Sequence, residues 1–187
     1  MAAPPATALV MSNMGIFSCL TAIKPESAES PVSILWTNIC ATFFTTNAGF
    51  KIADKEPVGQ DEMIPDAIVF QIRMRNPAAG QPQQSWQVQE KQIFIVECKR
   101  PSKDTPAEWD SALDQLAQYC EANVNGSQRI LGATAIGTKV KFWRYDAPNM
   151  IPLVNGTFDL NEAAGRNEVE AQLIYVRNNG WNWTASG

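Results

Sequence analysis

The stretch Gln92–Pro101 reads Q-I-F-I-V-E-C-K-R-P, an apolar run with the character of a buried strand that ends in an acid and a base. Charged side chains are rarely buried without a partner, so the two charges at the end of this strand need an explanation. Because side chains alternate between the two faces of a strand, we expect Ile93, Ile95, Glu97 and Lys99 on one face. The opposite face would carry Phe94, Val96 and Cys98.

A second acid lies upstream, where Pro65 and Asp66 come directly before the strand-like run Ala67–Ile72. Proline is tolerated at the first residue of a strand, so we expect the strand to begin here. If this strand pairs with the first one, Asp66 meets Glu97 and Lys99 at one end of a sheet. Three charged groups would then converge.

The two motifs together have a known counterpart. Pro65–Asp66 followed by Glu97–Lys99 resembles the signature of the PD-(D/E)XK nuclease superfamily, also called restriction-endonuclease-like. The segment Gln115–Tyr119, on a predicted helix after the second motif, resembles the Gln-x-x-x-Tyr motif of the RecB-like branch of that superfamily. The resemblance implies an α/β fold with an αβββαββ core, in which helices flank a central mixed sheet.

The resemblance also implies an activity, the metal-dependent hydrolysis of phosphodiester bonds in nucleic acid, in DNA more than in RNA. Mg²⁺ or Mn²⁺ would take oxygen ligands, which Asp66, Glu97 and the backbone carbonyl of Cys98 would supply. Lys99 would position the attacking water or stabilise charge in the transition state. Gln115 and Tyr119 would orient that lysine or bind a phosphate group.

One departure from the superfamily pattern concerns its acids. Many members carry a further acid on the first helix, but the segment Val32–Phe44 contains none. Glu29, with Glu26 behind it, is the nearest candidate. A second metal position therefore depends on where the chain before the helix lies.

Basic residues near the motifs form a candidate phosphate-binding rim. Arg73, Arg100 and Lys103 are predicted to contact nucleic acid. The wider set also contains Arg75, Lys139, Lys141 and Arg144. Scattered cations are also typical of an ordinary solvated surface.

Composition bounds the remaining possibilities. The 187 residues are 45% hydrophobic, which is enough for one globular domain, expected over residues 30–187 after an arm or lead-in at 1–29 that is not a core element. The net charge of -4 argues against indiscriminate binding of polyanions, so nucleic-acid affinity must come from a local patch.

The chain lacks the residues that several kinds of site need. It has no histidine, and its four cysteines form no C-x-x-C pair, so zinc sites and Ser/His/Asp nucleophiles lose their partners. We expect reduced thiols, an intracellular location and no membrane span. Three glycosylation sequons, at Asn125, Asn155 and Asn182, would matter only on a secreted route.

Periodicity and cap residues predict the order of the elements. The first helix should run from Ser30, as N-cap, to about Thr45, and a later helix should start at Pro106 behind the N-cap Thr105. The other predicted elements are strands at 50–55, 67–72, 92–98, 130–136 and 139–145, a loop at 56–62, a longer excursion at 76–84, and a final helix at 168–176 that a loop separates from the last strand.

Plainer interpretations stay open beside the catalytic one. The Glu97 and Lys99 pair is also compatible with a structural ion pair at a sheet end, and Asp66 with an ordinary turn acid. A nuclease-like fold without turnover, which binds a protein or nucleic acid, is the alternative function.

Overall fold

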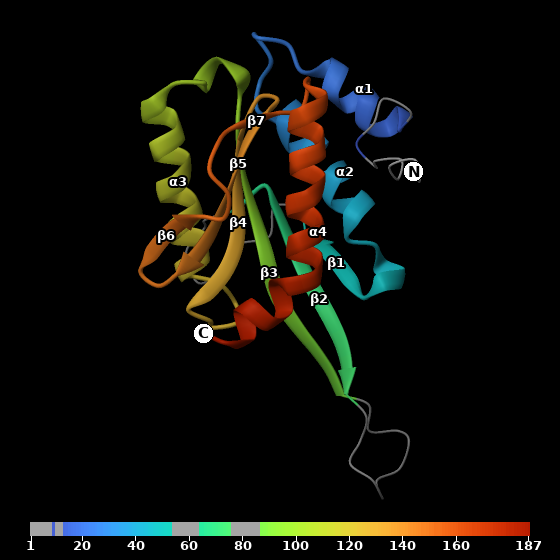
Figure 1. Cartoon of the computed structure of the whole chain (residues 1–187), viewed down its shortest axis with the longest axis vertical. Coiled ribbons are helices and arrows are strands. Elements are labelled where there is room, and N and C mark those ends of the chain that lie inside the picture. Colours follow the sequence, from blue (N-terminus) through green and yellow to red (C-terminus); the bar gives the residue numbers. More distant parts are fainter. Residues whose placement is uncertain (1–8, 10–12, 54–63, 76–86) are drawn as a thin grey trace, which may run out of the picture.

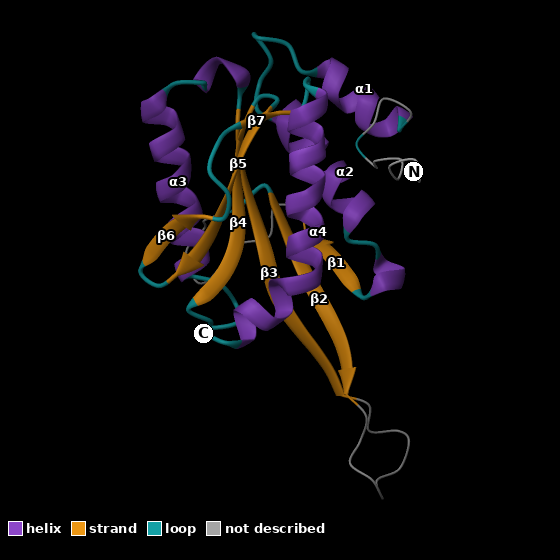
Figure 2. Ribbon diagram, viewed as in Figure 1, coloured by secondary structure: helices purple, strands orange, loops and turns teal. Residues whose placement is uncertain are grey.

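The structure is a computed structural model, and it describes residue 9 and residues 13–53, 64–75 and 87–187 of the chain. The predicted loop at 56–62 and the excursion at 76–84 lie outside the described residues. Figures 1 and 2 show the arrangement of the elements. The helices are α1 (Met14–Ala22), α2 (Ser30–Phe43), α3 (Pro106–Glu121) and α4 (Ala163–Ala185), with short 3-10 turns η1 (Thr46–Ala48) and η2 (Pro101–Lys103). The strands are β1 (Phe50–Ala53), β2 (Ala67–Arg75), β3 (Gln87–Lys99), β4 (Arg129–Ile136), β5 (Lys139–Asp146), β6 (Asn149–Pro152) and β7 (Phe158–Asp159).

The strands form one mixed sheet. Within the described residues its order is β1-β2-β3-β4-β5-β6, and β7 pairs with β5. Strands β3 and β4 run parallel, and the other pairs are antiparallel. The parallel pair is joined through α3, as a parallel connection requires a crossover. The predicted α/β class, with helices on a central mixed sheet, is confirmed, and the elements from α2 to β5 follow the order αβββαββ.

Helices cover both faces of the sheet. On one face α1, α2 and α4 enclose the larger hydrophobic cluster, which includes Phe94 and Val96 of β3. On the other face α3 packs on Ile95 through Leu116. The two sides of β3 therefore face two separate cores, which is why this strand is almost entirely apolar until Glu97.

Helix α3 is seated by two local features. The Thr105 hydroxyl accepts a hydrogen bond from the Glu108 backbone N–H at 3.4 Å, so the predicted N-cap is confirmed. Gly132 of β4 lets the helix approach closely, because a Cβ there would meet the Leu116 side chain at 2.9 Å. These contacts set the position of Gln115, one residue before Leu116.

Several boundaries differ from the sequence predictions. Residues 14–22 form helix α1, and Ile16 and Leu20 are buried in the larger core, so the expectation of no core element before Ser30 is wrong for this segment. Ser30 is the first residue of α2 rather than its N-cap, and no side chain caps this helix. The predicted loop after the last strand contains β6 and β7, and α4 is much longer than 168–176 because its apolar face continues to Trp181.

A β-bulge changes which side chains of β3 share a face. Val69 of β2 lies opposite Phe94, but the next residue, Phe70, lies opposite Gln92, so Ile93 is the extra residue. Ile93 consequently packs in the larger core with Phe94 rather than with Ile95 as predicted. Residues of β3 before the bulge have exchanged faces relative to a regular strand.

The described part of the chain contains no helix that is both long and apolar enough to cross a membrane. Its four cysteines are free thiols.

Candidate functional site

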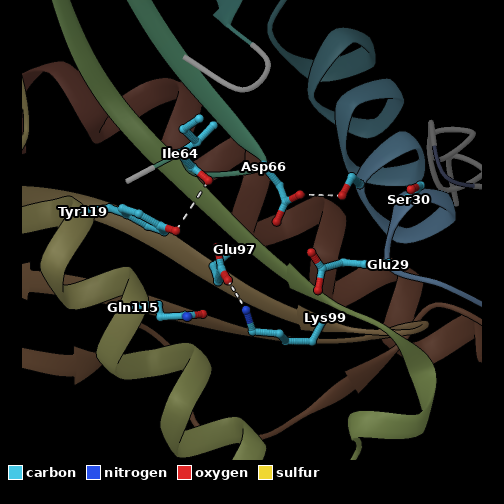
Figure 3. Close-up of a pocket in the computed structure, with 9 residues that line it drawn as sticks. Glu29, Ser30, Ile64, Asp66, Glu97, Lys99, Gln115 and Tyr119 are labelled. Carbon is cyan, nitrogen blue, oxygen red and sulfur yellow. Dashed lines mark hydrogen bonds and ion pairs between the residues drawn. The ribbon is translucent and has the colours of Figure 1, made fainter. Parts of the chain in front are cut away.

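A cavity of about 340 Å³ lies where β2 begins and β3 ends. Figure 3 shows its side chains converging from α3, from the two strands and from the start of α2. The lining residues are Glu29, Ser30, Ser33, Ile64, Asp66, Glu97, Lys99, Gln115 and Tyr119. Five predicted site residues are therefore brought together: Asp66, Glu97, Lys99, Gln115 and Tyr119.

Asp66 is held by hydrogen bonds to both of its carboxylate oxygens. Ser33 Oγ on α2 donates to Oδ1 at 2.5 Å, and the Cys98 backbone N–H on β3 donates to Oδ2 at 2.8 Å. The Asp66 backbone N–H donates to the Val96 carbonyl at 3.2 Å. These bonds fix the buried carboxylate at the junction of β2 and β3, and each oxygen keeps a lone pair for a further partner.

Glu97 and Lys99 form the predicted pair on one face of β3. The Lys99 ammonium contacts Glu97 Oε1, and the glutamate is only 3% exposed. Burial raises the pKa of Glu97 to about 7, against the lowering effect of Lys99, and the charges of Asp66 and Glu29 raise it further. The site therefore holds an acid that exchanges its proton near neutral pH.

The pKa of Lys99 is raised. Burial by itself lowers it, but the hydrogen bond and charge of Glu97, with the charges of Glu29 and Asp66, outweigh that effect. Lys99 therefore stays an ammonium at neutral pH, and it acts by charge and hydrogen bonding rather than as a base.

Glu29 completes the acidic side of the pocket. It comes immediately before α2, and Figure 3 shows its carboxylate directed into the space between Asp66 and Lys99. This carboxylate thus enters the pocket from the residue that precedes α2 rather than from the helix itself. The sequence pattern identified Glu29 only as the nearest candidate.

Gln115 and Tyr119 enter the pocket from α3, one helical turn apart. Gln115 Oε1 is buried and has no hydrogen-bond partner among the described residues, so an acceptor faces the pocket unused. The Tyr119 hydroxyl donates to the Ile64 carbonyl at 3.4 Å. Burial, followed by the charges of Glu97 and Asp66, raises the pKa of Tyr119, which keeps the phenol protonated.

Other predicted residues lie elsewhere. Cys98 points its side chain into the larger core, and only its backbone faces Asp66. Arg73 is seven residues from Asp66 along β2, roughly 23 Å at the rise of a strand, so it is not part of a rim around this pocket. Lys103 pairs with Glu108, and Arg100 is exposed beyond the end of β3. Neither of these two lines the cavity.

Ser33 is the functional residue that the sequence reasoning missed. It is 7% exposed and lies on the same helix face as buried apolar residues, one turn after Glu29. A small hydroxyl among the apolar positions of an amphipathic helix was the available signal. Its partner 33 residues away could not be deduced from spacing.

The donor set suits a hard divalent cation in its chemistry. Carboxylate oxygens of Asp66, Glu97 and Glu29 face one cavity, and these are the ligands that Mg²⁺ and Mn²⁺ prefer. In the described part of the chain, no three acidic or thiol side chains form a ready-made metal cluster. Glu97 is instead turned toward Lys99. The pocket therefore has the right atoms, and a metal site would need rotation of a side chain.

Neither a protein-family model, nor a curated protein, nor a solved structure matches this chain. Function must therefore be argued from the chemistry of the pocket, because one fold hosts many activities.

Proposed function

We propose that this chain is a metal-dependent nuclease that hydrolyses phosphodiester bonds of nucleic acid, DNA more than RNA, in the pocket of Asp66, Glu97 and Lys99. The observation that carries the proposal is the meeting of two buried acids and a lysine from neighbouring strands in one cavity. The motif resemblance supports the same reaction. Gln115 and Tyr119 of the helix motif line this cavity too.

The residues would hold Mg²⁺ or Mn²⁺ through Asp66 and Glu97, with Glu29 and the Cys98 carbonyl as further candidate ligands. When bound, the ion would lower the pKa of a water and offset the charge that develops on the scissile phosphate. Asp66 suits this role because Ser33 and the Cys98 N–H hold its carboxylate in one orientation.

The other pocket residues would orient the reactants. Lys99 would donate from its ammonium group to the attacking water or to a phosphate oxygen. Gln115 Oε1, which has no partner within the described part of the chain, would accept a hydrogen bond from that water or from Lys99. Tyr119 would remain a neutral donor beside Glu97.

The direct test is cleavage of plasmid DNA, single-stranded DNA and RNA in Mg²⁺, in Mn²⁺ and in EDTA. We expect cleavage that EDTA abolishes, and a loss of at least about 100-fold in Asp66→Asn and in Lys99→Ala, since removing one charge-stabilising group typically costs this much. Asp114→Asn is the matched control, because it removes an exposed acid of α3 that does not line the pocket. Equal rates in Asp66→Asn and the control would contradict the proposal.

The second candidate function is a nuclease-like fold that binds a protein or nucleic acid without turnover. It is favoured by the contacts that the pocket residues make with one another. Glu97 is bound to Lys99, and both carboxylate oxygens of Asp66 accept hydrogen bonds from the protein. Such a network is also compatible with a purely structural role. Folded wild-type protein that cleaves none of the substrates with either cation would favour this function over the nuclease.

A further inference from the structure

Four neighbouring strands each carry a cation at the end of the sheet opposite the pocket. These are Arg73 on β2, Lys91 on β3, Arg129 on β4 and Arg144 on β5. The row crosses three strand spacings, roughly 14 Å of the width of the sheet. All four face α4, and Lys91 does so because the bulge at Ile93 exchanges the faces of β3 before it.

Two tryptophans of the last turns of α4 hold these cations. Arg73 and Lys91 lie 4.3 and 5.5 Å from the centre of the Trp181 ring. Arg129 and Arg144 lie 4.8 and 6.0 Å from the centre of the Trp183 ring. Cation–π contacts of this kind orient flexible basic side chains without neutralising their charge.

Three of the four cations in this row, Arg73, Lys91 and Arg144, have no ion-pair partner among the described residues. Of the acids on the same strands, Glu97 lies in the pocket and pairs with Lys99, Glu90 points to the opposite face and pairs with Lys51, and Asp146 pairs with Arg129. From residue 171 onward the chain contains Arg177 and no acid. In a chain of net charge -4, this surface is a local concentration of positive charge.

Arg129 has a structural task, so the inference rests on the other three cations. Its Nη1 donates to the Ser186 carbonyl at 3.3 Å, at the C-terminal end of α4, besides its ion pair with Asp146. Arg73 and Arg144 are exposed, and among the described residues they contact only the tryptophan rings as binding partners of their charge.

We infer that Arg73, Lys91 and Arg144 form a binding surface for the phosphate backbone of double-stranded nucleic acid. Trp181 is only 8% exposed under two cations, so it is not an open platform on which unpaired bases could stack. The surface therefore recognises backbone charge rather than bases.

This inference deepens the proposed function, because it names how a substrate would be anchored away from the pocket. Lys91 is six residues from Glu97 along β3, roughly 20 Å at the rise of a strand. Because Lys91 and Glu97 face opposite sides of the sheet, the surface would hold a part of the nucleic acid other than the segment in the pocket.

The experiment measures binding without cleavage. Fluorescence anisotropy of a labelled duplex of about two helical turns is recorded in EDTA over a series of salt concentrations. Arg73→Gln/Arg144→Gln removes two cations of the surface. The matched control Lys24→Gln/Lys51→Gln removes an exposed cation near the end of α1 and one that is already paired with Glu90, and it changes the net charge equally. Circular dichroism melting curves verify that both variants are folded.

We expect Kd to rise about eightfold for each lost phosphate contact at 0.1 M salt, roughly sixtyfold for the double variant, and the slope of log Kd against log salt to fall by about 1.8. The control should bind within about twofold of wild type. The inference is overturned by no duplex binding in the wild type, by equal loss in the control, or by tighter binding to single strands or to anionic lipid vesicles. Wild type that binds the duplex but never cleaves overturns the nuclease proposal alone.

Discussion

At the scale of single residues, the pocket depends on contacts between groups that are distant in sequence. The Ser33 hydroxyl on α2 and the Cys98 N–H on β3 both donate hydrogen bonds to Asp66 and hold its carboxylate in one orientation. Glu97 sits beside Lys99 with Asp66 and Glu29 close enough to raise its pKa. Each of these contacts can be removed by one substitution.

Ser33→Ala should lower the free energy of unfolding by about 1.5–3 kcal/mol, because a buried hydrogen bond to a charged group is lost and Asp66 Oδ1 loses its donor. Ser30→Ala is the control, because it removes an exposed hydroxyl of the same helix that makes no hydrogen bond within the described residues, and its stability is expected within about 0.5 kcal/mol of wild type. Urea unfolding of both variants measures the difference. Equal stabilities would show that the Ser33 bond contributes nothing.

Glu97 should make stability depend on pH. Its pKa is about 7 in the folded state against an ordinary value of 4.5, so the folded protein holds a proton that the unfolded chain releases. The stability that Glu97 contributes is then fully present below about pH 4.5, and it is lost as the pH rises to about 7. At about 1.4 kcal/mol for each pKa unit, the loss approaches roughly 3 kcal/mol.

Urea unfolding in EDTA over this pH range tests the point, with Glu97→Gln as the comparison. The glutamine cannot ionise, so the variant should lack the part of the pH dependence that comes from residue 97. Parallel curves for the two proteins would mean that the pKa of Glu97 is not raised.

At the scale of elements, the site depends on the seating of α3 against the sheet. The cap at Thr105 starts the helix, and Gly132 allows Leu116 to touch β4. Gln115 reaches the pocket only because α3 begins directly after Thr105 and because Gly132 lets the helix lie close to the sheet.

Thr105→Ala should cost about 1 kcal/mol of unfolding free energy through loss of the N-cap bond. Ser111→Ala, which changes an exposed serine in the middle of the same helix, is the control and should be close to neutral. Guanidinium unfolding compares the two variants. If Thr105→Ala unfolded at the same guanidinium concentration as wild type, the result would argue against the cap. It would not argue against the placement of the pocket residues.

At the scale of the whole molecule, the acidic pocket and the basic surface lie at opposite ends of β2 and β3. Clustered carboxylates strain the pocket electrostatically, and a divalent cation that neutralises them should stabilise the native state. A ligand that binds only the folded protein raises Tm by mass action.

Mg²⁺ or Mn²⁺ at about ten times its Kd should therefore stabilise the fold by roughly 1.4 kcal/mol, visible as a rise in Tm. Asp66→Asn should abolish the rise, and Lys99→Ala should retain it because the carboxylates remain. Asp114→Asn controls for general loss of negative charge. Melting curves that ignore millimolar cations, with no heat in isothermal titration, would leave the proposed reaction without its metal.

Local patterns in the sequence determined much of the framework. The alternation and apolarity of residues 93–98 predicted β3 and its terminal Glu97 and Lys99, and the Thr105–Pro106 start predicted α3. The αβββαββ order followed from these and similar segments, and the mixed sheet was implied by the motif resemblance. Such features depend on interactions within a few residues or on a repeating side-chain direction, so they can be recognised without knowledge of the fold.

Only the tertiary structure decided which distant groups meet. It placed Ser33 on Asp66, directed Glu29 into the pocket, buried α1 against the larger core, and moved Arg73 away from the predicted rim. The bulge at Ile93 turned Lys91 toward α4, although simple alternation assigns it to the face of Glu97. The physical reason is that strand register and helix packing are set by the fit of whole surfaces, and one extra residue in a pairing reverses every side chain before it.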